Sequence, residues 1–143
     1  IARAVLDACE GAATILAYNM PFEKQCLERL SEANGVDRLL GGRVRWLVPK
    51  LVDLLPLVRD HVYDPAFFGK FGLKNVLPVL VPDLSYEDLA IQDGQVASTL
   101  LERLVFGELA AEERARLTQD VLAYCERDTW ATVRLFEALE QIA

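Results

Sequence analysis

Histidine is nearly absent from this sequence, and cysteine is scarce and unpaired. The 143 residues include one histidine and three cysteines, without any Cys-x-x-Cys or cysteine–histidine spacing. Zinc sites built from cysteine and histidine use such spacings, so the sequence gives no support for that class of metal site. The odd number of cysteines also argues against a disulfide framework. We therefore expect buried, reduced cysteines in a cytoplasmic protein.

Long apolar runs and targeting signals are missing as well. No run approaches the roughly 18 residues that a membrane span needs, and the first residues lack the basic segment of a secretory signal. Hydrophobic residues make up 52% of the chain and charged residues 26%, which is typical of a globular protein. The sequence predicts a single domain over residues 1–143 without a membrane partner.

Positive charge is in short supply overall, because the formal net charge is -7. An acidic chain is a poor candidate for nucleic-acid binding. Residues 43–74, however, hold six basic residues against three acidic ones, so this segment carries +3 and the remainder -10. Such a basic strip can attract phosphates. The alternative, an ordinary solvated surface with scattered lysine and arginine residues, explains it at least as well.

The pattern of apolar residues predicts a helix-rich α/β chain. We expect helices at residues 1–10, 21–33, 45–58, 74–80, 94–106 and 111–141, with Phe22 facing inward. Short strands are expected at residues 14–18, just before Pro21, and at residues 61–63. Two strands do not form a stable layer alone, so a partner or an upstream segment is expected to complete the sheet.

The last predicted helix carries one acidic residue on its apolar face. Positions stepping by three or four residues form the stripe Leu117, Val121, Tyr124, Asp128, Ala131, Leu135, Ala138 and Ile142. Burying an unpaired carboxylate is unfavourable, so Asp128 needs a partner. Three explanations are open: pairing with a buried arginine or backbone amide, a solvated kink, or a divalent cation. Tyr124 lies one turn earlier on the same face.

A second polar cluster follows the first predicted strand. Asn19, Phe22 and Glu23 lie where that strand gives way to a helix, and free amide groups and the helix dipole favour polar chemistry there. Taken alone, these residues are better explained by structural roles. Asn19 would be a turn or cap residue, and Glu23 would be the carboxylate of the first helical turn.

Together the two clusters resemble a known family. Asn19-x-x-Phe22-Glu23 is similar to the second motif of the DEDD exonucleases, and Tyr124-x-x-x-Asp128 is similar to their third motif in its tyrosine form. The chain therefore resembles a DEDDy-type 3′–5′ exonuclease domain of the ribonuclease H-like superfamily. Residues 73–78, 84–86 and 93–94 are similar to an uncharacterised bacterial branch of it, in which Glu commonly replaces the second-motif Asp.

The resemblance implies a two-metal phosphodiesterase acting on the 3′ end of a nucleic acid. Two Mg²⁺ or Mn²⁺ ions would stabilise the attacking and leaving oxygens. Asp128 would ligate one ion, Glu23 would ligate or support the other, and Tyr124 would orient the attacking water. The substrate contacts would come from Asn19, Phe22 and Lys74.

The first motif of that family, Asp-x-Glu on a strand, is absent from residues 1–143. We expect it upstream of Ile1 together with three strands, so that this chain would be the C-terminal two-thirds of an exonuclease-like domain and inactive alone. The leading alternative is a non-catalytic ribonuclease H-like module that binds nucleic acid or a protein partner. A plain helical scaffold, in which Asp128 is paired structurally, is a second alternative.

Overall fold

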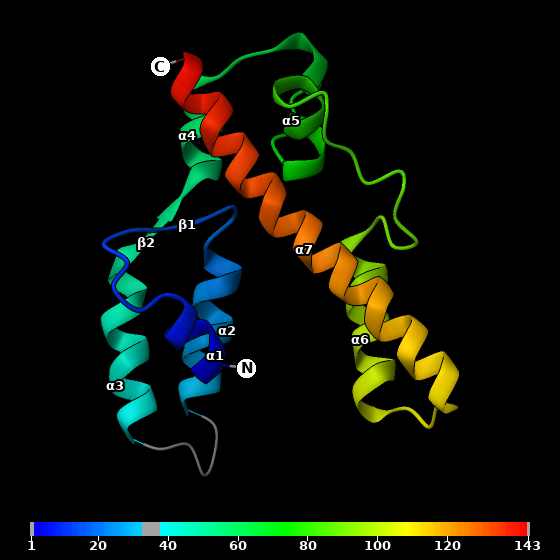
Figure 1. Ribbon diagram of the computed structural model, residues 1–143. Coiled ribbons are helices and arrows are strands. Elements are labelled where there is room, and N and C mark those ends of the chain that lie inside the picture. The colour runs from blue at the N-terminus through cyan, green and yellow to red at the C-terminus, as the bar shows by residue number, and fades with distance from the viewer. Residues whose placement is uncertain (1, 33–37, 143) are drawn as a thin grey trace. The chain divides into compact units, whose positions relative to one another are not determined.

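The computed structural model of the protein describes residues 2–32 and 38–142 (Figure 1). In chain order the elements are α1 (Ala2–Ala8), β1 (Ile15–Ala17), α2 (Pro21–Glu32), α3 (Arg38–Leu47), the 3₁₀ helix η1 (Val48–Lys50), β2 (Leu51–Asp53), α4 (Leu54–His61), the 3₁₀ helix η2 (Pro65–Phe67), α5 (Leu73–Leu80), α6 (Gly94–Phe106) and α7 (Ala111–Ile142). The described part of the chain is mostly helical and has two short strands. The prediction of a helix-rich α/β chain is confirmed at this level.

The chain divides into two compact units, residues 1–65 and residues 66–143. We call them the N-terminal unit and the C-terminal unit, and each is described by itself. The N-terminal unit contains both strands and the helices α1 to α4, while α5, α6 and α7 belong to the C-terminal unit. That the two form a single domain stays a prediction.

The two strands of the N-terminal unit pair in parallel, with Ile15 opposite Leu51 and Ala17 opposite Asp53. The carboxyl ends of both strands therefore lie at the same edge, which brings the start of α2 close to the start of α4. A small apolar core joins the helices around them. Its buried residues are Leu6 of α1, Leu27 of α2, and Val44 and Leu47 of α3.

Two of the elements predicted for the N-terminal unit are wrong. Residues 45–58 do not form one helix, because α3 ends at Leu47 and the strand β2 intervenes before α4 begins at Leu54. Residues 61–63, predicted to be the second strand, are the end of α4 and the residues after it. A continuous apolar run conceals a three-residue strand next to a helix, because periodicity does not separate the two. Asp53 marks the start of α4 in the sequence, because Asp is a preferred N-cap residue.

The first two predicted helices agree with α1 and α2 over the residues that the structure describes. The helix expected at residues 1–10 is α1, which ends at Ala8, and the one expected at 21–33 is α2, which reaches Glu32. Residues 1 and 33 lie outside the described residues. The first predicted strand is also confirmed, as β1 lies within residues 14–18.

The C-terminal unit is built around α7, a helix of 32 residues that packs against α5 and α6. Its buried face follows the predicted stripe as far as Leu135, with the buried residues Leu117, Val121, Tyr124, Ala131 and Leu135. The stripe is wrong at its end, because Ile142 is 59% exposed and Leu139 is buried instead. The helix α6 has its predicted bounds because Asp93 caps it, accepting hydrogen bonds from the amides of Gln95 and Val96.

Over residues 2–32 and 38–142, the structure contains no helix with the length and apolar character that crossing a membrane requires.

Candidate functional site

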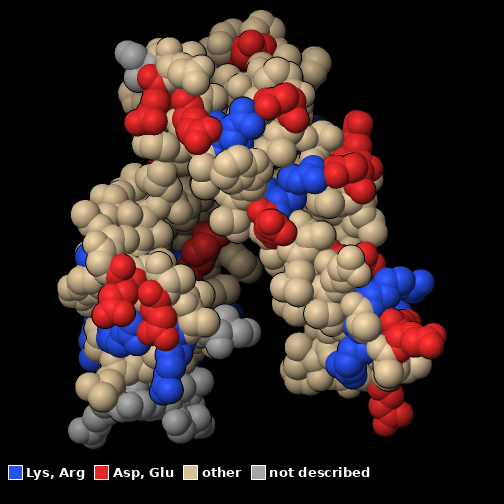
Figure 2. All heavy atoms as spheres, in the orientation of Figure 1, with Lys and Arg blue, Asp and Glu red and all other residues tan. Residues whose placement is uncertain are grey.

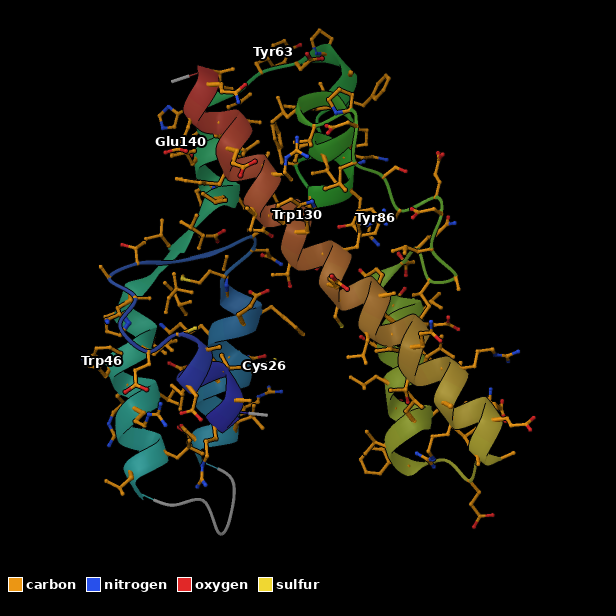
Figure 3. The ribbon with its side chains drawn as sticks, in the orientation of Figure 1. Cys26, Trp46, Tyr63, Tyr86, Trp130 and Glu140 are labelled. Atoms are coloured by element: carbon orange, nitrogen blue, oxygen red, sulfur yellow. The ribbon has the colours of Figure 1, made fainter. Side chains whose placement is uncertain are left out.

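Asp128 is half-buried on α7, and a tyrosine from the segment between α5 and α6 holds its carboxylate. Figure 3 labels this tyrosine, Tyr86. The hydroxyl of Tyr86 donates a hydrogen bond of 2.8 Å to Oδ1 of Asp128. Tyr86 is 8% exposed, so this bond lies at the edge of the core. The sequence correctly indicated that Asp128 needs a partner, but a tyrosine hydroxyl was not among the three explanations left open.

Tyr124 lies one turn before Asp128 and is also buried. The rings of Tyr124 and Tyr86 pack against each other, with centroids 6.0 Å apart and planes inclined at 42°. Burial raises the pKa of Tyr124 to about 12, and the negative charge of Asp128 adds to the rise. Burial, and then the hydrogen bond to Asp128, raise the pKa of Tyr86 as well. Both phenols are therefore protonated at physiological pH and can donate hydrogen bonds, as Tyr86 does to Asp128.

Lys74 of α5 contacts both tyrosines. Its ammonium lies 4.8 Å from the ring centroid of Tyr86 and 4.9 Å from that of Tyr124, and it donates a hydrogen bond of 2.5 Å to the carbonyl of Gln92. A cation above an aromatic face is attracted by the negative centre of the ring. The structure thus brings Lys74, predicted to contact phosphate, together with Tyr124 and Asp128. We call Lys74, Tyr86, Tyr124 and Asp128 the tyrosine–aspartate cluster.

A small pocket and a closely packed glycine border this cluster. A pocket of about 200 Å³ is lined by Lys74, Leu77, Pro78, Leu84, Ser85, Tyr86, Glu87 and Gln92. At Gly94 a Cβ would lie only 3.3 Å from the hydroxyl oxygen of Tyr124, which is tighter than an ordinary contact. Glycine at this position therefore keeps the hydroxyl of Tyr124 from being displaced.

A larger pocket, of about 950 Å³, lies along α7 but holds neither Tyr124 nor Asp128. Its lining is largely apolar and includes Leu122, Trp130 and Val133, all exposed in the structure. Figure 3 shows Trp130 on this helix.

The residues predicted at the other cluster, Asn19, Phe22 and Glu23, follow β1 and begin α2 as expected. Asn19 adopts a φ of 68°, the left-handed region in which asparagine is favoured among residues with a side chain. Its amide donates to Oδ1 of Asp53 at 2.9 Å, and the amide of Met20 donates to Oδ2 of Asp53 at 3.1 Å. The turn that starts α2 is therefore tied to the end of β2.

Asp53 is a residue whose role the sequence analysis missed. Besides holding the amides of Asn19 and Met20, it caps α4 by accepting a hydrogen bond of 3.0 Å from the amide of Leu55. One carboxylate thereby joins the end of β1 to the starts of two helices. Burial raises the pKa of the neighbouring Tyr18 to about 12, and the charge of Asp53 contributes.

Phe22 and Glu23 are both exposed in the first turn of α2. The inward orientation predicted for Phe22 is wrong, because its side chain is 65% exposed at the start of α2. An exposed aromatic ring there is open to contact with a ligand. Glu23 is exposed in the first turn of α2, where the helix dipole favours a carboxylate. The structural roles considered for Asn19 and Glu23 are thus both observed.

The predicted site residues form two groups, and each lies within one unit. Asn19, Phe22 and Glu23 belong to the N-terminal unit, whereas Lys74, Tyr124 and Asp128 belong to the C-terminal unit. Across residues 2–32 and 38–142, no three or more side chains of histidine, cysteine, aspartate or glutamate gather as a metal site. A carboxylate oxygen is the donor that Mg²⁺ and Mn²⁺ prefer, so Asp128 fits as one ligand. A complete metal centre needs further carboxylates.

The basic strip of residues 43–74 is divided between the two units, and most of it is engaged within the protein. The engaged residues are Arg43 with Asp7, Arg59 with Asp60, Lys50 with the carbonyl of Ala12 and the ring of Trp46, and Lys74 as described above. Figure 2 shows the same intermixing on the face in view, where basic side chains lie next to acidic ones. These contacts favour the interpretation of the strip as ordinary surface over that of a phosphate track.

The raised pKa values of the tyrosines predict a loss of stability at high pH. Tyr18 and Tyr124 titrate near 12 in the folded protein, above the ordinary value of 10.0, so the folded state holds these protons more tightly than the unfolded chain. Their stabilisation is complete below pH 10 and is lost as the pH rises towards 12. We expect the Tm from circular dichroism to fall across this window, and to fall less in Tyr124→Phe. An equal fall in the two proteins would contradict the assignment.

The comparisons with known proteins place the chain in an uncharacterised family. Residues 1–72 match the family described as "Domain of unknown function (DUF2779)". This match covers half of the chain, and the chain belongs to that family.

A similar curated protein is the "Uncharacterized protein UU173" of Ureaplasma parvum serovar 3 (strain ATCC 700970). It is 22% identical over 133 residues, which cover 82% of this chain and 19% of that protein. The chain thus spans about a fifth of the length of this relative. No solved structure matches the chain.

Proposed function

We propose that this chain is part of a metal-dependent 3′–5′ exonuclease-like domain that hydrolyses nucleic-acid phosphodiesters. The observation that carries the proposal is the tyrosine–aspartate cluster. A half-buried carboxylate on a rigid helix has one oxygen held by Tyr86, with a neutral phenol and an ammonium group beside it. Such an arrangement combines a ligand for a hard cation, a donor for a water molecule and a positive charge.

The N-terminal unit supports the same proposal through its topology. Parallel strands place the functional residues that follow them at one edge, and Asn19 and Glu23 follow β1 at that edge. Phe22 exposes its ring in the first turn of α2. A ribonuclease H-like sheet, with β1 and β2 as two of its strands, is part of the proposal.

In the proposed mechanism, Asp128 would hold one Mg²⁺ or Mn²⁺ ion, and Glu23 would hold or support a second. Such ions would supply charge stabilisation to the attacking and leaving oxygens. Tyr124 donates a hydrogen bond that orients the attacking water, because its raised pKa keeps the phenol protonated. Lys74 offers charge to a phosphate, while Asn19 and Phe22 contact the terminal nucleotide.

The proposal is tested by incubating the protein as its gene encodes it with a single-stranded oligonucleotide. We expect release of mononucleotides from a labelled 3′ end in the presence of Mn²⁺, and none after chelation by EDTA. A substrate with a blocked 3′ end should be resistant, which distinguishes an exonuclease from an endonuclease. Mn²⁺-independent cleavage, or an absence of release from both DNA and RNA, would contradict the proposal. Binding of nucleic acid without cleavage would favour the non-catalytic module instead.

A further inference from the structure

We propose that Tyr86 is a positioning residue for Asp128. Residues 83–88 form an arm that is attached to α7 and places the hydroxyl of Tyr86 next to the Asp128 carboxylate. This inference rests on the proposed function, because it gives the Asp128 carboxylate a defined orientation towards a metal ion. We call residues 83–88 the Tyr86 arm. They belong to the segment between α5 and α6, which contains neither helix nor strand.

A carboxylate on a helix turns about its side-chain torsions unless something holds it. The 2.8 Å hydrogen bond from the hydroxyl of Tyr86 engages Oδ1 of Asp128 and restricts how the carboxylate can turn. Hydrogen-bonded partners of this kind orient the ligands of metal sites, and their loss typically lowers metal affinity or activity about 10–100-fold. Tyr86 therefore selects which oxygen of Asp128 is presented.

The Tyr86 ring is itself held from two sides. Tyr124 packs against it with a centroid distance of 6.0 Å, and the ammonium of Lys74 lies 4.8 Å from its centroid. The same ammonium contacts the ring of Tyr124 and the carbonyl of Gln92. Lys74 thus fixes the two aromatic rings relative to each other, so the hydroxyl of Tyr86 approaches Asp128 from one direction.

The arm is fastened on both sides of Tyr86 by the residue next to Asp128. The guanidinium of Arg127 pairs with the carboxylate of Asp88 through two bonds of 2.7 Å, and it also donates to the carbonyl of Ser85. Farther along α7, Arg134 pairs with Asp83 at 3.1 Å. A bidentate pair has a fixed geometry that a single exposed ion pair lacks. Arg127 therefore anchors the arm, and Asp128, the next residue of α7, accepts the hydrogen bond from Tyr86.

A purely structural role is the competing explanation. Tyr86 is buried, and a buried hydroxyl takes whatever acceptor lies nearest. Under that explanation, removing the hydroxyl changes thermal stability and leaves metal binding alone. Under our proposal, it changes metal binding and leaves most of the packing intact, because a phenyl ring still fills the space between Lys74 and Tyr124.

The experiment compares Tyr86→Phe with the wild type in the protein as its gene encodes it. Mn²⁺ is the probe, and its binding is followed by the loss of the EPR signal of the free ion. We expect the apparent Mn²⁺ dissociation constant to rise about 10–100-fold. The Mn²⁺ concentration for half-maximal nucleotide release should rise in parallel, while KM for the oligonucleotide stays unchanged and saturating Mn²⁺ restores kcat.

Two further variants complete the test. Tyr63→Phe is the matched control, because Tyr63 is 85% exposed, and it should bind Mn²⁺ as the wild type does. Asp88→Asn loosens the Tyr86 arm without altering the tyrosine, so it should shift the Mn²⁺ dissociation constant in the same direction by a few-fold. It also provides a result if Tyr86→Phe fails to fold.

The outcomes separate this inference from the proposed function. Unchanged Mn²⁺ binding in a folded Tyr86→Phe protein, or in Asp88→Asn, overturns the inference while the wild-type exonuclease activity stands. A wild type that neither binds Mn²⁺ nor releases nucleotides overturns both. A lower Tm with wild-type Mn²⁺ dependence assigns Tyr86 a structural role and also overturns the inference.

Discussion

Replacing Asp128 by asparagine is expected to lower kcat for Mn²⁺-dependent nucleotide release on the order of a thousandfold. Asparagine has nearly the same shape and keeps an oxygen that can accept the hydrogen bond from Tyr86. The substitution therefore removes the negative charge that a metal ion requires and disturbs the packing little. The measurement is single-turnover release from a labelled 3′ end at saturating Mn²⁺, with circular dichroism to establish that the variant is folded.

The control for this prediction lies on the same helix. Glu126→Gln removes an exposed carboxylate of α7 two residues away and should leave kcat within about twofold. If Asp128→Asn retains full activity, Asp128 is not part of the site. If Asp128→Leu raises the Tm and changes no activity, the carboxylate is a structural feature tolerated by the core, since replacing a buried polar pair by apolar groups is often stabilising.

The long helix of the C-terminal unit could be predicted because its information is local. The stripe that contains Leu117, Val121 and Leu135 repeats at helical spacing, and the capping residue Asp93 marks where α6 begins. The same pattern identified Asp128 as an exception on its apolar face. Elements whose ends are encoded within a few residues are thus accessible from the sequence.

The partner of Asp128 was not accessible in the same way. Tyr86 and Asp128 are separated by 42 positions, and Tyr86 lies in a segment without helical or strand periodicity. Only the folded chain brings them together, through the pairing of Arg127 with Asp88. Long-range hydrogen bonds of this kind leave no signature in local spacing, so the hydrogen bond that supports Asp128 could not be predicted.

The failures in the N-terminal unit have a different cause. The strand β2 has three residues and lies within an apolar run that continues into α4, so its pattern is shared with a helix. Phe22 was assigned to the interior because it is apolar and follows a helix start, yet the buried residue of α2 is Leu27. Apolar character alone does not establish burial, because much of a protein surface is apolar.

Replacing Asp53 by alanine is expected to lower the free energy of unfolding of the N-terminal unit by about 2–4 kcal/mol. Three amide groups, those of Asn19, Met20 and Leu55, lose a charged acceptor at once. Loss of an N-cap alone costs about 0.5–2 kcal/mol, and a hydrogen bond to a charged group contributes about 1.5–3 kcal/mol. The sum is reduced because Asn19 is exposed and water rehydrates its amide.

This prediction is checked by urea unfolding followed through tryptophan fluorescence. Trp46 lies in the N-terminal unit and Trp130 in the other, so a Trp130→Phe background reports the N-terminal unit alone. Asp60→Ala removes an exposed carboxylate paired with the adjacent Arg59 and should leave the free energy of unfolding nearly unchanged. Asp53→Asn keeps an acceptor oxygen and should fall between the two. An Asp53→Ala protein as stable as Asp60→Ala would show that the carboxylate does not hold the turn. The left-handed conformation of Asn19 would then be maintained by the neighbouring residues of the chain. The position of Glu23 in the first turn of α2 would depend on the helix alone.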